Sequence, residues 1–324
     1  MIGRGIKEIM VFIATAGALI CSVILFSYYA YRTAYYNSPK KNEDIYRLPH
    51  GEQYERERER MTALISKMDS IPYEEVWIES FDGVRLFGRY CHKNDGAPLQ
   101  IQFHGYRGNA IRDFCGGNKL ARDAGQNTLV VDQRAHGRSG GRTITFGIKE
   151  RYDCLSWVKY ACKRFGSDTE IYLSGVSMGA ATVLMASELE LPANVAGIIA
   201  DCPYSSPEAI IRKVCRDKGY PPRLTMPFLR LGAFLFGHFD IKSCTAIGAV
   251  KNATVPILLI HGEDDRFVPC EISREIFEAC GGNAVCETFP DAGHGLSFIV
   301  DAKRYADIID RFVLMCRETH SLKS

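Results

Sequence analysis

The sequence predicts an α/β protein with a largely parallel central sheet, covered by helices on both faces and preceded by a transmembrane helix. Three features of the 324-residue chain lead to this prediction. An uncharged run lies near its start, short apolar runs alternate with helical segments through most of it, and a tight glycine–serine–glycine cluster follows one of those runs. The length is sufficient for one large domain or two small ones.

Residues 1–36 are predicted to form a single-pass membrane anchor. The run from Ile9 to Ala30 contains no charged residue, and as a helix it would extend about 33 Å, against a hydrocarbon core of about 30 Å. A cleaved signal peptide is the alternative, but the run is too long for one and Ala14-Thr15-Ala16 falls too early to be its cleavage site. Tyrosines resembling an interfacial belt follow at Tyr28, Tyr29, Tyr31, Tyr35 and Tyr36.

The charges around this anchor leave its orientation open. The positive-inside rule, applied to the basic residues on each side of the run, slightly favours a main domain in the cytoplasm. The short N-terminal tail also suits an anchor whose main domain is exported. The basic residues counted are Arg4 and Lys7 before the run and Arg32, Lys40, Lys41 and Arg47 after it.

Residues 37–70 are predicted to form a tether that includes a linker helix. The run "ERERER", Glu55 to Arg60, is typical of a solvated helix face with local ion pairs, although such a run can also bind a partner. Apolar residues continue the helical spacing at Met61, Leu64, Ile65 and Met68.

Residues 71–324 are predicted to form the main domain. It opens with a hairpin whose turn contains Asp82-Gly83. Buried-type strands then alternate with helices, which indicates a parallel sheet with helices on both faces. The predicted strands are residues 99–103, 128–131, 170–173, 195–200, 256–260 and 284–289, and the clearest helices are 149–165, 271–279 and 301–317.

Three of these strands end in residues suited to nucleophilic catalysis. Ser177 lies in "SGVSMGA", Asp265 in "HGEDDRFVP" and His294 in "PDAGHG". The carboxyl ends of parallel strands meet at one edge, where functional groups collect. A serine hydroxyl is a weak nucleophile unless a base takes its proton. Gly175 and Gly179 would let the chain turn sharply and expose Ser177, although a plain glycine-rich turn is the alternative.

These motifs, with the His104-Gly105 loop and the order Ser…Asp…His, resemble the α/β-hydrolase superfamily of serine hydrolases over residues 73–317. Within it, the chain is most similar to the esterases and lipases of the serine aminopeptidase-like (S33, hydrolase-4) type. The resemblance implies that Ser177 is the nucleophile, His294 the base and Asp265 the acid. Asp201 is a rival acid, because some members place the acid at that earlier strand end.

The resemblance also implies an oxyanion hole and a cap. The backbone amides of Tyr106 and Met178 would bind the oxyanion. An insertion at about residues 203–253 would form a small helical cap, whose apolar side chains would either line an acyl pocket or pack the cap onto the domain. Those side chains are Met226, Phe228, Leu229, Leu231, Phe234, Leu235 and Phe236.

The expected function is hydrolysis of carboxylic esters, on a small acyl-ester or lipid-like substrate at a membrane. A peptidase or amidase with the same residues is the alternative within enzymes, and a non-catalytic binding module is the alternative outside them. The net charge of +2, without a basic stripe, argues against a nucleic-acid partner.

No metal or organic cofactor is expected. His261, Glu263 and Asp264 could offer metal ligands, but neighbours on one tight turn rarely converge on an ion. The twelve cysteines form no Cys-x-x-Cys pair, and a disulfide between Cys280 and Cys286 is left open.

Overall fold

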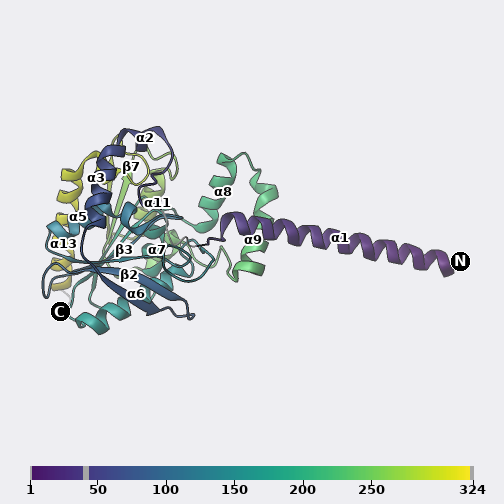
Figure 1. Ribbon diagram of the computed structural model, residues 1–324, viewed down its shortest axis with the longest axis horizontal. Helices are drawn as coiled ribbons and strands as arrows, with labels where there is room; N and C mark the ends of the chain where they lie inside the picture. The colour runs from purple at the N-terminus through teal and green to yellow at the C-terminus, as the bar shows by residue number, and fades with distance from the viewer. Residues whose placement is uncertain (1, 39–43, 322–324) are drawn as a thin grey trace.

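The computed structural model describes residues 2–38 and 44–321, which contain one eight-stranded sheet (Figure 1). Its strand order is β1-β2-β4-β3-β5-β6-β7-β8. The β1–β2 and β2–β4 pairs are antiparallel and all other neighbours are parallel, which confirms the predicted sheet. The strands are β1 (Glu74–Glu79), β2 (Arg85–Cys91), β3 (Leu99–Phe103), β4 (Asn127–Val131), β5 (Ile171–Val176), β6 (Val195–Asp201), β7 (Ile257–Gly262) and β8 (Ala284–Phe289).

Helices cover both faces of the sheet. Side chains alternate between the faces along a strand, so Ile171 and Leu173 of β5 pack into the larger hydrophobic cluster while Tyr172 packs with Phe312 on the other side. Helices α6 (Glu150–Phe165), α7 (Met178–Ala186), α10 (Ala246–Ala249) and α11 (Glu271–Ala279) cover the first face, and α10 leads into a short 3-10 turn, Val250–Asn252. Helices α5 (Cys115–Asp123), α12 (Ser297–Val300) and α13 (Ala302–Ser321) cover the second.

Helix α1 (Ile2–Ala34) projects from this body as one continuous helix (Figure 1). Its segment Lys7–Ala34 is long and apolar enough to cross a membrane, with a mean hydropathy of 2.6, and the most apolar part of it is not buried. The predicted tyrosine belt is divided, because Tyr28 and Tyr29 are exposed whereas Tyr31 and Tyr35 are buried in the body. Lys40 and Lys41, which we counted for the orientation, lie outside the described residues, as does the side chain of Arg4.

The cap forms from helices α8 (Pro207–Asp217) and α9 (Pro222–Gly237), and α9 packs along the body-proximal part of α1 (Figure 1). The approach is close, since a Cβ on Gly232 would lie 2.4 Å from the carbonyl oxygen of Ser27. The rings of Phe228 and Phe236 contact those of Phe26 and Tyr28, at centroid distances of 5.7 and 5.1 Å. Helix α1 is therefore joined to the cap as well as to the chain that follows it.

The predicted linker helix is present as α3 (Arg58–Asp69), preceded by the short α2 (Glu52–Arg56). Met61 and Ile65 are buried in a cluster with Phe114, which follows helix α4 (Ala110–Asp113). Surface ion pairs join Arg56 to Glu52 and Arg58 to Glu55, as the charge run suggested. The segment thus packs on the main domain, while the domain limits that we predicted remain predictions.

Candidate active site

Ser177 lies on a sharp turn between β5 and α7. Its backbone has φ 55° and ψ −112°, a conformation that a residue with a side chain rarely adopts. The two glycines around it are sterically required. A Cβ on Gly175 would lie 2.2 Å from the backbone of Gly179, and one on Gly179 would lie 1.8 Å from the carbonyl oxygen of Phe103. The turn closes only with glycine at both positions, and it holds the Ser177 hydroxyl away from the strand.

The structure brings Ser177, His294 and Asp265 into one chain of hydrogen bonds. The Nδ1 atom of His294 is 2.6 Å from Oδ2 of Asp265. Since a carboxylate only accepts, Nδ1 carries the proton and Nε2 is left as the acceptor. The Oγ atom of Ser177 lies 2.9 Å from that Nε2 and donates to it. The arrangement provides a hydroxyl next to a basic nitrogen, with a carboxylate behind the ring.

Asp265, after β7, is held from several directions. Its Oδ1 accepts the backbone N–H groups of Phe267 and Val268, at 2.9 and 2.8 Å. The Nε2 atom of the buried His261 lies 3.1 Å from Oδ2 of Asp265, which is the same oxygen that His294 contacts. Burial alone would raise the pKa of Asp265, but the hydrogen bonds from His261 and His294 hold that pKa well below its usual value. The carboxylate is therefore charged at neutral pH.

The loop after β3 lies against Ser177. A Cβ on Gly105 would be 3.5 Å from the Cβ of Ser177. The loop is fixed on both sides of Tyr106, because Gly105 N–H donates to Asp113 at 2.9 Å and Arg107 N–H donates to Nε2 of His136 at 2.9 Å. Burial lowers the pKa of His136 to about 3, which keeps its ring neutral and able to accept.

Met178 is the first residue of α7, where a backbone N–H has no carbonyl partner within the helix. The amides of Tyr106 and Met178 thus belong to the two segments that meet at Ser177. They remain our predicted oxyanion donors.

A cavity of about 510 Å³ opens at Ser177 and His294. Its wall comes from the α4–α5 region, from Phe298 and Ile299 of α12, and from the N-terminal segment that includes Gln53, Tyr54 and Met61. None of the seven apolar cap residues borders this cavity, so of the two roles considered for them the structure does not favour pocket lining. Met226 and Leu229 are buried and the rings of Phe228 and Phe236 contact α1, whereas Phe234 and Leu235 are exposed.

Tyr54 and Gln53 were missed by the sequence reasoning. Tyr54 donates a hydrogen bond of 2.8 Å to the carbonyl oxygen of His294. The Gln53 side chain lies directly over Gly293, where a Cβ would overlap with it. Nothing in the local sequence links this helix to a loop some 240 positions away, so only the tertiary structure shows that α2 supports the His294 loop.

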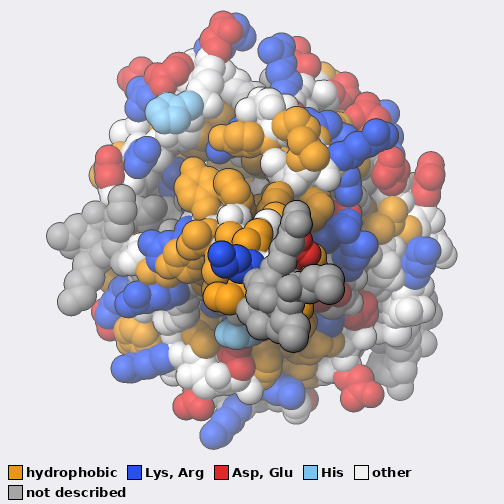
Figure 2. Space-filling view, turned by 90° about the vertical axis from the view of Figure 1, so that its right-hand side faces the viewer, with side chains coloured by type: hydrophobic (Ala, Val, Ile, Leu, Met, Phe, Trp, Pro, Cys, Tyr) orange, Lys and Arg blue, Asp and Glu red, His pale blue; other side chains and the backbone are white. Residues whose placement is uncertain are grey.

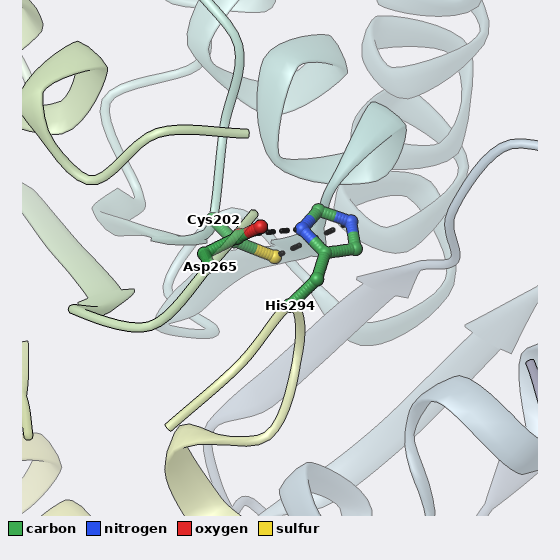
Figure 3. Close-up of side chains that lie close together, drawn as sticks. All are labelled: Cys202, Asp265 and His294. Atoms are coloured by element: carbon green, nitrogen blue, oxygen red, sulfur yellow. Dashed lines mark hydrogen bonds and ion pairs between the residues drawn. The ribbon is translucent and has the colours of Figure 1, made fainter. Parts of the chain in front are cut away.

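A cysteine also lies beside His294 (Figure 3). The Sγ atom of Cys202, directly after β6, is 3.9 Å from Nε2 of His294, and Cys202, Asp265 and His294 together could hold a metal ion. A metal would require a thiolate, yet burial and the nearby Asp201 raise the pKa of the Cys202 thiol well above its usual value. The hydrogen bond between His294 and Asp265 also occupies the space between two of the ligand atoms.

The ligands that we had considered at the β7 turn do not converge. His261 is fully buried and contacts Ser273, whereas Glu263 and Asp264 are exposed. Cys280 and Cys286 are both free thiols.

Asp201 is not the partner that the His294 ring contacts. Its Oδ2 accepts the hydroxyl of Tyr305 at 3.1 Å, and its Oδ1 is buried without a hydrogen-bond partner among the described residues. Burial raises the pKa of Asp201 to about 6. The geometry therefore favours Asp265 over Asp201 as the acid behind His294.

The sheet order, the Ser177 turn at β5 and the polar residues after β7 and β8 together define the α/β-hydrolase fold. A family model described as alpha/beta hydrolase fold matches residues 101–225. The chain therefore has the α/β-hydrolase fold. Solved structures agree: the esterase Pf2001 of Pyrococcus furiosus aligns with a TM-score of 0.63 at 21% identity, covering 86% of this chain and 98% of that one.

A second solved structure, Est1E of Butyrivibrio proteoclasticus with bound ferulic acid, aligns with a TM-score of 0.58 at 23% identity, over 75% of this chain and 99% of that one. Among curated proteins, the uncharacterized YqkD of Bacillus subtilis is 23% identical over 298 residues, which cover 92% of this chain and 95% of the relative. The human protein ABHD12B is 28% identical over 195 residues, 57% of this chain and 50% of the relative. These identities establish the fold and leave the substrate open.

Proposed function

We propose that this chain is a membrane-anchored serine hydrolase that cleaves carboxylic esters, of the serine aminopeptidase-like (S33, hydrolase-4) type. The observation that carries the proposal is the hydrogen-bonded series from Ser177 Oγ through His294 to Asp265. The strained backbone of Ser177 supports it, because proteins retain such strain mainly at functional sites. The esterase names of similar folds agree with this reading.

In the proposed reaction, Ser177 Oγ attacks the acyl carbonyl carbon while Nε2 of His294 takes the hydroxyl proton. The carbonyl oxygen becomes an oxyanion, and the amides of Tyr106 and Met178 donate to it. Each such donor typically lowers the barrier by about 3 kcal/mol. The tetrahedral intermediate then collapses, and the leaving alcohol takes the proton from Nε2.

Deacylation repeats these steps with water. Nε2 of His294 removes a proton from a water molecule, whose oxygen attacks the acyl carbon of the acyl-enzyme. The carboxylic acid leaves and Ser177 regains its proton. Asp265 stays ionised throughout and stabilises the imidazolium, which is consistent with its low pKa.

The cavity supports an acyl ester as substrate. Its inner wall carries Phe114, Phe298, Ile299 and Met61, which suit an acyl chain, and it lies next to the Ser177 hydroxyl. The exposed apolar length of α1 supports anchoring in a membrane.

A fluorophosphonate probe tests the nucleophile on the detergent-solubilised full chain. We expect labelling of the parent protein and none of the Ser177→Ala variant, with equal melting temperatures as the control for folding. Absence of labelling on folded parent protein would favour the non-catalytic binding module. A series of p-nitrophenyl esters of rising chain length, compared with aminoacyl anilides, then separates an esterase from a peptidase or amidase.

A further inference from the structure

Helix α9 has an apolar face that the described part of the chain leaves exposed. Leu224 is 68% exposed, Phe234 is 66% exposed and Leu235 is 39% exposed. Apolar residues also stand between them at Pro227, Phe228 and Leu231, and this spacing of three to four residues puts all six on one side of the helix. A soluble helix would normally carry polar residues on that side.

This face is continuous with the body-proximal part of α1. Phe228 contacts Phe26, and Phe236 contacts Tyr28. The missing side chain of Gly232 lets the two helices touch at Ser27. Because α9 is fixed to α1 along this contact, the position of α1 in a membrane also determines the position of α9.

The length of α1 gives the depth at which α9 lies. A hydrocarbon core of about 30 Å corresponds to about 20 helical residues. Counted from Ile9, the first residue of the uncharged run, those residues end near Tyr28. Phe26 and Tyr28 are two of the residues that contact α9, so α9 would lie where the hydrocarbon core meets the headgroups.

The charge of the cap is suited to the headgroup region. Within residues 203–250, seven basic residues stand against three acidic ones. Figure 2 views the molecule from the side on which α1 projects, so that α1 points toward the viewer, and it shows hydrophobic side chains at the centre of this face and Lys and Arg side chains around them. The basic residues are Arg212, Lys213, Arg216, Lys218, Arg223, Arg230 and Lys242.

We propose that α9 is a second membrane contact, lying along the bilayer surface with Leu224, Phe234 and Leu235 among the outer acyl chains. It would act as an interfacial amphipathic helix beside the span, with the cap arginines and lysines at the lipid phosphates. This proposal depends on the membrane anchoring proposed above, and it assigns the exposed apolar residues of the cap a lipid-binding role, which is neither of the two roles considered from the sequence.

Tryptophan fluorescence with brominated lipids tests this contact. The full chain is placed in nanodiscs whose lipids carry bromine near the top of the acyl chains. Phe234→Trp and Leu224→Trp are two independent reporters on α9. Leu314→Trp is the matched control, because Leu314 is 58% exposed on α13, at the opposite end of the body in Figure 1. The parent protein, which has two tryptophans, gives the baseline.

We expect both α9 reporters to lose about half of their added emission, since interfacial helices lie roughly 5–10 Å into the headgroup boundary. The Leu314→Trp reporter should be unaffected. A fourth variant, Leu19→Trp, reports on α1 with bromine placed deep in the chains. Quenching of Leu19→Trp without quenching on α9 would overturn the cap proposal alone. No quenching at Leu19→Trp would overturn the anchor and the cap contact together.

A second copy of the chain is the other occupant that could cover this face. In that case the α9 reporters would stay unquenched while crosslinking in the nanodisc gave dimers. That result would also refute the lipid contact.

Discussion

Two aspartates lie close to His294, and we expect their replacement by asparagine to have different effects on activity. Asp265 accepts the Nδ1 proton of His294 at 2.6 Å, whereas Asp201 accepts the hydroxyl of Tyr305. Replacing Asp265 by Asn removes the acceptor that fixes the imidazole tautomer. Losses of about 10⁴ in kcat follow from such a change in serine proteases, equivalent to about 5.5 kcal/mol. We expect a loss of this order for Asp265→Asn and activity close to that of the parent for Asp201→Asn.

The two variants should also differ in how their stability depends on pH. Burial raises the pKa of Asp201 from 3.8 to about 6 in the folded chain. A carboxyl group with a raised pKa contributes stability that is complete below its unfolded pKa and is lost as the pH rises through 6. The shift of about two units corresponds to about 3 kcal/mol. Between pH 2 and pH 8, the free energy of unfolding of Asp201→Asn should therefore rise by about 3 kcal/mol relative to that of the parent, which is about 5 °C in melting temperature.

The pH dependence of stability has the opposite sign at Asp265, because His261 and His294 hold the pKa of its carboxyl group low against the effect of burial. Its stabilisation is present above about pH 4, the unfolded value, and is lost as the pH falls below it. The melting-temperature gap between the parent and Asp265→Asn should thus narrow in acid. Melting curves from pH 2 to pH 8 measure both stability effects, and esterase kinetics at neutral pH measure the effect of each variant on activity. If folded Asp201→Asn lost activity as Asp265→Asn does, or if Asp265→Asn kept it, our choice of the acid would be refuted.

Three further substitutions test packing. Gly179→Ala places a methyl group 1.8 Å from a backbone carbonyl of β3, so we expect a loss of more than about 4 kcal/mol or no folded protein, seen by denaturant unfolding. Tyr54→Phe removes the hydrogen bond to the His294 loop; it should cost about 1 kcal/mol and lower kcat with little change in KM, and an unchanged kcat would disprove the link between α2 and catalysis. Gly232→Val should loosen α1 from the cap and increase proteolysis of α9, whereas Gly17→Val, where an added Cβ meets nothing, should have no such effect.

Much of the sheet could be predicted because its central strands are short, rich in apolar residues and buried, and because they alternate with helical segments. The predicted bounds of β3 and β8 agree with the structure, and β5 was predicted too short. It extends to Val176 because the strand continues into the Ser177 turn through Gly175, a residue that strand propensity disfavours. The contact of Ser177 with His294 follows from strand order, since both follow parallel strands whose ends meet at one edge.

The wall of the cavity could not be predicted, because it depends on contacts between distant segments. Met61 has the same apolar spacing whether it faces a cavity or a core. The apolar residues of α9 match an acyl pocket, a core or a lipid surface equally well, and only the position of α1 separates these cases. Tyr31 and Tyr35 were likewise indistinguishable from an interfacial belt until their burial was known.

The continuity of α1 has a consequence for how such an enzyme would meet its substrates. A long flexible linker would let the catalytic domain rotate freely and reach esters in solution or on neighbouring surfaces. Here Tyr31 and Tyr35 lie in the same helix as the apolar run and are buried in the body, so the domain would keep one height and one tilt above the bilayer. Its encounters would then occur in two dimensions, with molecules that diffuse in the same leaflet.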